Sequence, residues 1–347
     1  MSELRIAVVG AGFAARVVHL PGYSANMAPV AAICDLAKER AQALADQYRI
    51  PRVYTDWRRM IEQERPDAVS VCLPNALHRE VTIAALEAGT HVLCEKPLAT
   101  SVAEAREMFD AARRAGRLLM AAQHFRFEAG AHAIKRVVDS GALGEIYHGE
   151  AAAMLRLGIP TWGVFHQQAA SAGGVLFDIG VHILDLAMWL MGNPRPVRVS
   201  AVTQRRFGGR PEVAAIMGNA WDPDAFDVED FGVAFVRFDN GADLVLRASW
   251  AAHIAESHFN ALILGTEGGV TTHPPALFHL RNGVLANEEF KHLPARNSYE
   301  GEVRNFLAAL RGEGEPLVKE EETLNVQRIL NAAYRSAEEG REVEVEA

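Results

Sequence analysis

Cysteine and positive charge are both scarce in this sequence, and each scarcity narrows the class of protein. Only three cysteines occur among 347 residues, and Cys34, Cys72 and Cys94 each lie at or near the end of an expected buried strand. They suit small core side chains in a reducing compartment, which excludes a disulfide framework or a cysteine metal site. The 35 basic and 44 acidic residues give a net charge of −9. We therefore expect no nucleic-acid partner.

Long apolar runs are scarce as well. No run approaches the ~20 residues that cross a bilayer, and the first expected strand starts at Leu4, which leaves no room for a signal peptide. We therefore expect a cytoplasmic protein with no membrane partner. The rest of the composition, 49% hydrophobic and 23% charged residues, is that of a globular protein, and the length suits two domains better than one.

Through His124, apolar strands alternate with amphipathic helices, and this alternation predicts an α/β domain with a doubly wound parallel sheet over residues 1–124. The expected strands are 4–9, 30–34, 53–54, 68–73, 91–94 and 118–122, and the expected helices are 37–48, 56–64, 78–88 and 101–115. Ser101 caps the last helix, and Glu104 completes a capping box. Six strands suit a complete dinucleotide-binding domain, whose ligands lie beyond the carboxyl ends of the strands.

Beyond His124 the pattern becomes β-rich and predicts an α+β domain over residues 125–347 with a mainly antiparallel sheet. The expected strands are 145–155, 231–238, 243–250, 259–265 and 270–272, and the expected helices are 131–139, 298–310 and 320–338. The segment 239–242, Asp-Asn-Gly-Ala, predicts a hairpin turn. We expect the closing helices within 298–340 to pack back on the first domain. The loop 208–227 is long enough for a lid or a contact loop.

The first strand leads into a glycine-rich turn. Residues 4–15, LRIAVVGAGFAA, fit the pattern G-x-G-x-x-G/A with alanine in the third position. Gly10 permits the tight turn, Gly12 lets the backbone approach a pyrophosphate, and Ala15 lets the helix pack close to the strand. Phe13 and Ala14 open that helix, whose free N–H groups would hold the phosphates. The turn therefore predicts dinucleotide binding.

An acidic residue follows the second strand at the expected distance. Asp35 lies 35 − 10 = 25 residues after Gly10, where a carboxylate can accept hydrogen bonds from both ribose hydroxyls and repel a 2′-phosphate. A structural role as N-cap of the helix 37–48 is compatible with this function. We expect NAD, and the nearby Lys38 and Arg40 keep NADP open.

The second domain carries a second glycine-rich motif, GGVLFDIGVH, over residues 173–182. If Asp178 opens a helix that continues through Leu190, Asp178 and His182 lie four residues apart on one face. The carboxylate could then orient the imidazole and fix its tautomer. The plain alternative is an N-cap aspartate and a surface histidine. The adjoining glycines would permit close approach of a cofactor.

Together these segments resemble the Gfo/Idh/MocA oxidoreductases over essentially the whole chain. The resemblance lies in the G-x-G-x-x-A turn, Pro74-Asn75-x-x-His78, Glu95-Lys96-Pro97, the motif at 173–182 and the closing segment 299–345. It implies a Rossmann domain, a second domain with an open-faced sheet, and NAD or NADP as cofactor. It also implies oxidation of a sugar or polyol hydroxyl, or the reverse reduction, by a homodimer or homotetramer that assembles through the C-terminal sheet.

The resemblance makes Lys96, Asp178 and His182 the catalytic set. Oxidation of an alcohol releases a proton as hydride leaves, and a histidine with an ordinary pKa of about 6.5 can take that proton near neutrality. A lysine, ordinarily near pKa ~10.4, would need a depression of roughly three units for the same task. We therefore expect His182 to be the general acid/base and Lys96 to stabilise charge on the reacting oxygen. Asp178 would orient His182 or bind a neighbouring hydroxyl.

Further candidates surround this set. We expect six residues to lie along the cofactor: Leu73, Pro74, Asn75, His78, Glu95 and Pro97. The structural alternatives are a turn-forming residue for Asn75, a structural carboxylate for Glu95, and an N-cap or a surface residue for His78. The expected substrate-pocket residues are His124, Arg126, Arg156, Trp162 and His166. Trp162 is either a platform for a sugar ring or a core aromatic. The 13 histidines show no metal-binding spacing, so we expect no metal.

Two other functions remain open from the sequence. An NAD-dependent glycosidase of the same superfamily would oxidise, eliminate, hydrate and re-reduce its substrate, and would release sugar with its bound cofactor recycled. A non-catalytic dinucleotide-sensing regulator could dispense with Lys96 and His182, both of which this chain has. The sequence leaves the substrate and the direction of the reaction undetermined.

Overall fold

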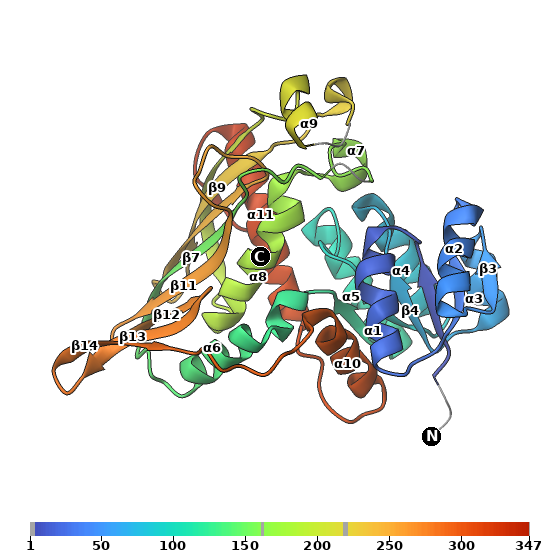
Figure 1. Cartoon of the computed structure of the whole chain (residues 1–347), viewed down its shortest axis with the longest axis horizontal. Coiled ribbons are helices and arrows are strands. Elements are labelled where there is room, and N and C mark those ends of the chain that lie inside the picture. Colours follow the sequence, from blue (N-terminus) through green and yellow to red (C-terminus); the bar gives the residue numbers. More distant parts are fainter. Residues whose placement is uncertain (1–3, 161–162, 218–220, 347) are drawn as a thin grey trace. The chain divides into compact units, whose positions relative to one another are not determined.

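The computed structural model describes residues 4–160, 163–217 and 221–346, and its chain divides into two compact units (Figure 1). The first unit comprises residues 1–124 and 297–323, and the second comprises residues 125–296 and 324–347. Trp162, one of the expected substrate-pocket residues, lies outside the described residues.

The first unit is built on a six-stranded parallel sheet in the order β3-β2-β1-β4-β5-β6. Its strands are β1 (Ile6–Val9), β2 (Val30–Cys34), β3 (Arg52–Tyr54), β4 (Ala68–Val71), β5 (His91–Cys94) and β6 (Leu119–Ala121). Its α-helices are α1 (Leu20–Ala25), α2 (Lys38–Tyr48), α3 (Trp57–Glu64), α4 (His78–Glu87), α5 (Val102–Ala115) and α10 (Ser298–Leu310). Every residue of β1 and β4 is buried, as expected for strands covered on both faces. The predicted doubly wound fold is confirmed.

Local signals fix the ends of these elements. The Ser101 hydroxyl accepts the N–H of Glu104, which is the predicted N-cap of α5. The Glu104 carboxylate, however, accepts the N–H of Thr100 and not that of Ser101, so the reciprocal half of the capping box is shifted by one residue. Gly116 ends α5 in the left-handed conformation with φ 61°.

A C-terminal helix completes the first unit. Helix α10 packs against α1, and a Cβ on Gly22 would lie 2.6 Å from a Val303 methyl carbon. The absence of a side chain at Gly22 therefore permits the close contact between the two helices. Asn26, just after α1, reinforces the contact because its side-chain amide donates to the Glu300 carbonyl at 3.0 Å.

The second unit is built on a nine-stranded sheet in the order β14-β13-β12-β11-β7-β10-β9-β8-β15. The strands are β7 (Ile146–Met154), β8 (Pro196–Gln204), β9 (Phe231–Phe238), β10 (Asp243–Ser249), β11 (His258–Gly265), β12 (Gly268–Thr272), β13 (Pro275–Arg281), β14 (Val284–Glu289) and β15 (Val343–Glu344). Strands β9 and β10 form the predicted hairpin, and the one parallel pair among the described strands of this sheet is β7 with β10. The predicted mainly antiparallel sheet is confirmed.

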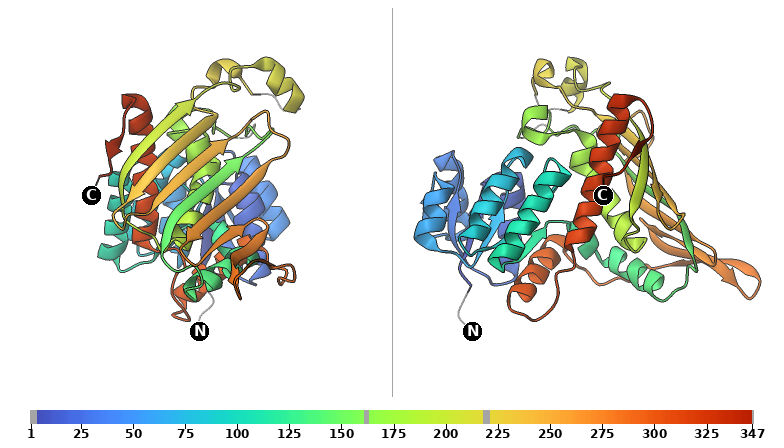
Figure 2. Two further views of the ribbon diagram at one scale, coloured as in Figure 1. Left: turned by 90° about the vertical axis from the view of Figure 1, so that its left-hand side faces the viewer. Right: turned by 180° about the vertical axis from the view of Figure 1, so that it is seen from behind.

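Helices cover one face of this sheet and leave the other bare. Helices α6 (Ala129–Asp139) and α8 (Val181–Leu190) pack on β7 and β11–β13. Helix α11 (Glu320–Glu339) lies beside β8, where Ser336 accepts the N–H of Ala201. In the left view of Figure 2, no helix crosses the broad outer face of the strands. The strands alternate accordingly, because Ala234 and Val236 are fully buried while Val233 and Phe235 are partly exposed.

Several expectations about this unit need correction. Strands β8, β13, β14 and β15 were not expected, and the loop 208–227 contains α9 (Pro211–Met217) and a 3₁₀ turn (Pro223–Ala225). The segment Gln168–Leu190, 23 residues long, contains an 18-residue window with a mean hydropathy of 1.5, so by length and composition alone it could cross a membrane. However, 89% of its apolar window is buried in the protein, which is the environment of a core helix.

Candidate active site

The glycine turn after β1 has the shape that a dinucleotide requires. Gly10 adopts φ 97°, and a Cβ there would lie 2.1 Å from the Cys72 carbonyl oxygen. A Cβ on Gly12 would meet no atom within 4 Å, so the space beside its backbone is open. Phe13 is 43% exposed at the start of the following helix. The turn therefore presents an accessible backbone edge where a pyrophosphate would bind.

Asp35 reaches back to this turn from the end of β2. Its Oδ2 accepts the N–H of Ala11 at 2.7 Å, and its Oδ1 accepts from Ala37 N–H at 2.8 Å and the Arg40 guanidinium at 2.7 Å. Burial alone would raise the pKa of this carboxyl, but the hydrogen bonds from Arg40, Ala11 and Ala37 outweigh burial and lower it. The carboxylate does not cap α2, whose N-cap is Ala37.

A fully buried histidine joins the two loops that follow β4 and β5. His78 is 0% exposed, and its ring nitrogens lie 2.9 Å from the Pro97 carbonyl and 2.8 Å from the Leu73 carbonyl. Burial lowers the pKa of His78, although these carbonyls act in the opposite direction. Neither the N-cap nor the surface alternative holds for this residue. Its side chain has no exposed surface, and it links the Leu73 and Pro97 carbonyls near the buried Asn75.

Glu95 belongs to a buried polar network that the sequence did not indicate. His19 bridges Ser70 Oγ and Glu95 Oε1, each at 2.9 Å, and Tyr23 reaches Ser70 at 2.8 Å. Burial favours the neutral form of Glu95, but the His19 hydrogen bond and the charges of His19, Lys96 and His124 prevail and lower its pKa to about 2. An ionised Glu95 therefore lies directly before Lys96.

No local pattern indicated that His19 belongs to this network. His19 is the last residue of a π-helix, Ala15–His19, that follows the glycine turn. A π-turn inserts one residue into the helical period, so spacing alone did not indicate that His19 faces the sheet. His124, an expected substrate residue of the same unit, is half-buried and its ring lies 4.7 Å from that of Tyr299.

In the second unit, Asp178 does not open a helix as expected. It lies within a second π-helix, Leu176–Gly180, and α8 follows from Val181. The preceding glycines also differ from expectation, because protein atoms crowd both of them: a Cβ on Gly173 would lie 2.3 Å from the Tyr334 hydroxyl, and one on Gly174 would lie 2.0 Å from the Glu229 carbonyl. These glycines serve helix packing in this unit.

Glu229 caps the start of this helical segment. Its carboxylate accepts the N–H groups of Gly174 and Leu176 at 2.8 and 3.0 Å and the Tyr334 hydroxyl at 2.7 Å. Burial raises the pKa of Glu229 despite these three donors. A carboxylate at this position satisfies free helical N–H groups and complements the helix dipole. The contact is long-range, and no local pattern indicated it.

The two expected catalytic residues of this unit have defined neighbours. Asp178 Oδ2 accepts the indole N–H of Trp250 at 2.9 Å. The ring of His182, 8% exposed, lies 5.1 Å from that of Phe125 in an edge-on arrangement. The structure thus places Asp178 and His182 in the second unit and Lys96 in the first.

Arg126, expected in the substrate pocket, has a structural role instead. It is 0% exposed and forms a two-pronged ion pair with Asp185 on α8, with distances of 2.7 and 2.6 Å. Asp185 lies three residues after His182, so the pair fixes α8 near the expected acid/base. A fully buried, paired guanidinium offers no face to a sugar.

The remaining substrate candidates differ in exposure. Arg156 is exposed, and its guanidinium donates to the Ala255 carbonyl at 3.0 Å. His166 is 9% exposed and stacks on Phe226, with ring centres 6.3 Å apart. Among the described residues, no group of three or more His, Cys, Asp and Glu side chains could hold a metal ion.

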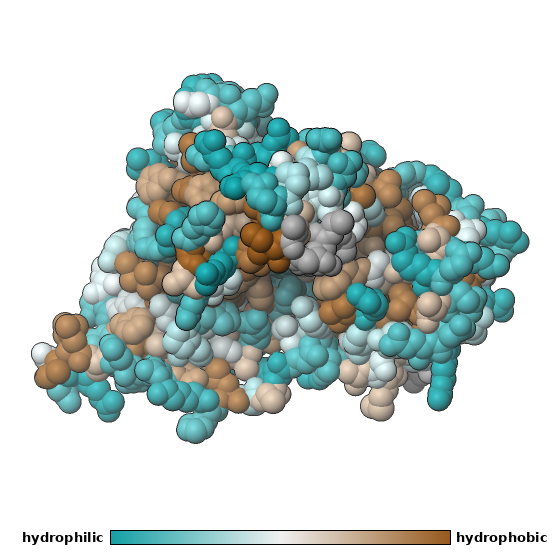
Figure 3. All heavy atoms as spheres, turned by 45° about the horizontal axis from the view of Figure 1, so that its top comes forward, coloured by the Kyte–Doolittle hydropathy of each residue, from teal (hydrophilic) through white to brown (hydrophobic). Residues whose placement is uncertain are grey.

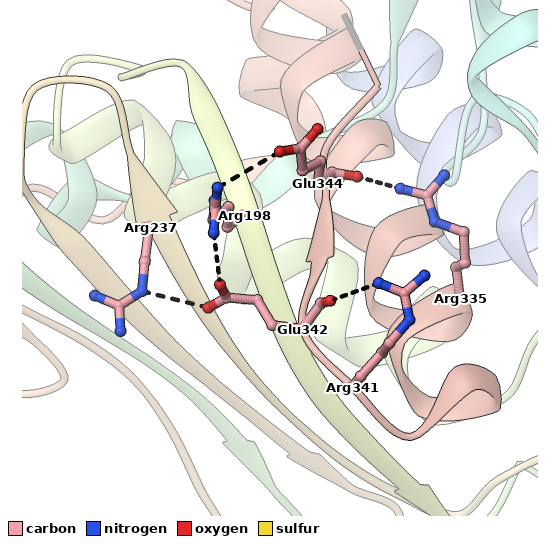
Figure 4. Close-up of polar contacts among 6 residues, drawn as sticks. All are labelled: Arg198, Arg237, Arg335, Arg341, Glu342 and Glu344. Carbon is pink, nitrogen blue, oxygen red and sulfur yellow. Dashed lines mark hydrogen bonds and ion pairs between the residues drawn. The ribbon is translucent and has the colours of Figure 1, made fainter.

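One hollow of the second unit has neither Asp178 nor His182 in its lining. It is lined by Arg198, Arg335, Glu339, Arg341, Glu342, Val343 and Glu344. Figure 4 shows that the arginines here have acidic or carbonyl partners: Arg198 pairs with Glu342 and Glu344 at 3.4 and 3.5 Å. Arg237, which is outside the lining, pairs with Glu342 at 3.4 Å. The hollow is therefore where strand β15 is tethered to the sheet.

The six-strand order and the glycine turn followed by Asp35 define a dinucleotide-binding fold. The model of the oxidoreductase family with an NAD-binding Rossmann fold matches residues 4–123, and that of the GFO/IDH/MocA C-terminal domain matches residues 131–271. The chain therefore belongs to the Gfo/Idh/MocA family and is an NAD(P)-dependent oxidoreductase with an NAD-binding domain.

Named relatives cover nearly the whole chain. It is 37% identical to D-glucoside 3-dehydrogenase of Escherichia coli strain K12 (99% of this chain, 98% of the relative) and 30% identical to 1,5-anhydro-D-fructose reductase of Ensifer adhaerens (99% and 98%). It also resembles the crystal structure of aldose-aldose oxidoreductase from Caulobacter crescentus, complexed with glycerol. That match has a TM-score of 0.81 and 29% identity, and it covers 99% of this chain and 100% of the other.

Proposed function

We propose that the chain transfers hydride between nicotinamide and a hydroxyl-bearing carbon of a sugar or sugar derivative. One observation carries the proposal: Asp178 and His182 lie on a segment held in place by Glu229, Trp250 and Arg126, in a chain whose other unit has an open dinucleotide turn. The full-length similarity to sugar oxidoreductases supports the substrate class. A secondary ring hydroxyl of a glucoside is the first candidate, because a D-glucoside 3-dehydrogenase is 37% identical.

The roles of the residues follow from their chemistry. Bound NAD supplies the hydride acceptor. His182 takes the hydroxyl proton at a ring nitrogen during oxidation and returns it during reduction. Lys96 donates a hydrogen bond to the reacting oxygen and stabilises negative charge there. Asp178 orients His182 or binds a neighbouring hydroxyl. This assignment requires Lys96 and His182, from two units of the chain, to serve one substrate.

The cofactor preference follows from Asp35. Its carboxylate is ionised and fixed by Ala11, Ala37 and Arg40, so it can accept ribose hydroxyls and repel a 2′-phosphate. We infer that NAD is used in preference to NADP. Gly12, Phe13 and Ala14 would contact the pyrophosphate, while Leu73, Pro74, Asn75, Glu95 and Pro97 would line the nicotinamide side.

The test is a spectrophotometric screen for reduced nicotinamide, run separately with NAD and NADP. The panel contains alkyl glucosides, 1,5-anhydro sugars, free aldoses and inositols, and the reverse assay uses the corresponding keto sugars. The proposal expects NAD-dependent turnover of at least one sugar class, and a fall in turnover of about a hundredfold or more in His182→Asn. A panel without signal in both directions contradicts it. Release of free sugar without net NADH would instead indicate the glycosidase.

We further infer that the enzyme is a cytoplasmic homo-oligomer that assembles through the bare face of the nine-stranded sheet. That face carries Val202, which is 54% exposed, and the partly exposed Val233, Phe235 and Val245. At one end of the sheet, the β13–β14 hairpin ends in exposed apolar residues, Leu280, Val284 and Leu285. Figure 3 shows hydrophobic surface over this hairpin, at the lower left. Exposed apolar surface of this kind marks interfaces. Light scattering of Val233→Glu, which should reduce the oligomer to smaller species, tests the inference.

A further inference from the structure

We propose that Trp250 is a positioning residue that orients the Asp178 carboxylate through its indole N–H. This inference rests on the proposed function, because it assigns Trp250 a task only if Asp178 serves the reaction. The contact itself is direct: Trp250 Nε1 donates to Asp178 Oδ2 at 2.9 Å.

The indole is well suited to this task because its ring is rigid and shielded from solvent. Trp250 is 0% exposed and is among the largest fully buried side chains described. A tryptophan ring has a single hydrogen-bonding atom, which donates and never accepts. When such a ring is buried, its N–H normally requires a partner, and here that partner is the carboxylate. The indole N–H bonds to Oδ2 of Asp178.

Two further contacts hold Trp250 in place. The backbone N–H of Trp250 donates to the Asp230 carbonyl at 3.0 Å, and Phe226 packs edge-on against the indole ring, with ring centres 6.1 Å apart. Asp230 is itself fully buried, and its carboxylate accepts the N–H groups of Arg206, Phe207 and Gly208. The donor therefore comes from a rigid corner of the sheet.

The acceptor is equally fixed. Asp178 belongs to a π-turn, and the start of that turn is held by the Glu229 carboxylate. Glu229 and Asp230 are adjacent, so one short segment before β9 fixes both the helix that carries Asp178 and the strand end that carries Trp250. An aspartate side chain has two freely rotating bonds, and a charge-assisted hydrogen bond from a rigid donor removes that freedom. Asp178 is thus oriented before substrate binds.

The first experiment compares Trp250→Phe with a matched control, Trp221→Phe. Trp221 is also buried and also donates its indole N–H, but to the Gly208 carbonyl at 2.7 Å. We expect Trp250→Phe to lower kcat about tenfold with KM and NADH affinity changed less than about twofold. Trp221→Phe should keep the kcat of the wild type even if its melting temperature falls as much as that of Trp250→Phe. Equal kcat losses in the two variants would indicate a general packing effect and overturn the proposal.

The second experiment observes the contact without catalysis. The chain has five tryptophans, so a ¹⁵N-tryptophan-labelled protein gives few indole N–H signals, and Trp250→Phe identifies the relevant one by its disappearance. Asp178→Asn should shift that signal and leave the Trp221 signal in place. An unchanged Trp250 signal would overturn the proposed contact.

A double-variant comparison separates the two levels of inference. If Asp178→Asn retains full activity, the proposed function of Asp178 is wrong. If Asp178→Asn loses activity while Trp250→Phe does not, only the positioning role is wrong. If both lose activity, adding Trp250→Phe to Asp178→Asn should cause no further loss, because the two residues act through one contact. An independent, multiplicative loss would overturn the positioning role.

Discussion

His19 and Glu95 share a hydrogen bond inside the first unit, with 2.9 Å between Nε2 and Oε1. The side chain of His19 is 0% exposed and that of Glu95 is 12% exposed. The pair joins the π-turn after the dinucleotide loop to the strand end that carries Lys96. A change in the charge of Glu95 would therefore alter both the stability of the first unit and the surroundings of Lys96.

Glu95 predicts a specific dependence of stability on pH. Its pKa is lowered from 4.5 to about 2, so its ionised form stabilises the fold fully above about pH 4.5. That contribution, up to about 3 kcal/mol, is lost as the pH falls toward 2. Glu95→Gln should therefore unfold more easily at neutral pH and show a flatter decline of stability between pH ~5 and ~2.

Chemical denaturation at several pH values measures this effect. Glu107→Gln is the control, because Glu107 is an exposed partner of Arg79 and surface pairs contribute little. Parallel curves for the wild type and Glu95→Gln would contradict the assigned pH dependence.

Two glycines predict opposite phenotypes for the same substitution. In Gly12→Ala the new methyl group meets no protein atom within 4 Å, so the melting temperature should stay unchanged. The methyl would occupy the approach of the pyrophosphate, and NADH affinity should fall about tenfold or more. In Gly174→Ala the methyl would lie 2.0 Å from the Glu229 carbonyl, and the fold should lose about 1–3 kcal/mol. Calorimetry and NADH titration of both variants test the pair; unchanged affinity in Gly12→Ala would contradict the first half.

Local sequence patterns predicted the Rossmann unit well. Strands β2 and β5 agree with the expected ranges 30–34 and 91–94 to the residue, because a short buried parallel strand is an uninterrupted apolar run. The hairpin of β9 and β10 was equally visible, since Asp239-Asn240-Gly241 marks the turn between two alternating segments.

Strands that depend on their neighbours were missed. Strand β8 starts at Pro196 and has exposed Arg198, Ser200 and Gln204 on its outer side, and β14 ends in Asn287-Glu288-Glu289. Both resemble loops until a sheet partner satisfies their backbone groups. The site partners His19, Glu229 and Trp250 were missed for a related reason, because their contacts join residues 51 to 76 positions apart and one sequence carries no sign of such pairs.

The buried pair of Arg126 and Asp185 predicts a strong asymmetry between single and double substitutions. Asp185→Asn removes the carboxylate that pairs with the buried guanidinium and should cost about 3–5 kcal/mol. Arg126→Met combined with Asp185→Leu removes both charges and should cost clearly less. Urea denaturation measures each variant, with Glu288→Gln of the exposed Arg281–Glu288 pair as the control. A double variant as unstable as Asp185→Asn would contradict the role of the buried charge.

Asp35 predicts how the cofactor preference can be changed. Asp35→Ser removes the carboxylate that repels a 2′-phosphate and frees Arg40 from its 2.7 Å ion pair, so that Arg40 can meet the phosphate. The ratio of kcat/KM with NADP to that with NAD should rise roughly tenfold or more. Adding Arg40→Gln should reverse most of the gain. A ratio unaffected by Asp35→Ser would contradict the role of this carboxylate.

Substitution of His182 should lower turnover without changing cofactor binding. His182→Asn keeps a polar side chain of similar size but cannot accept the hydroxyl proton, so turnover should fall by about two to four orders of magnitude. The dinucleotide turn lies in the other unit, so NADH affinity, measured by the fluorescence of the reduced cofactor, should stay within about twofold. His279→Asn is the matched control, because His279 pairs with Glu288 on the β13–β14 hairpin and should keep full turnover. Near-normal turnover of His182→Asn would show that another group moves the proton and would remove His182 from the catalytic set.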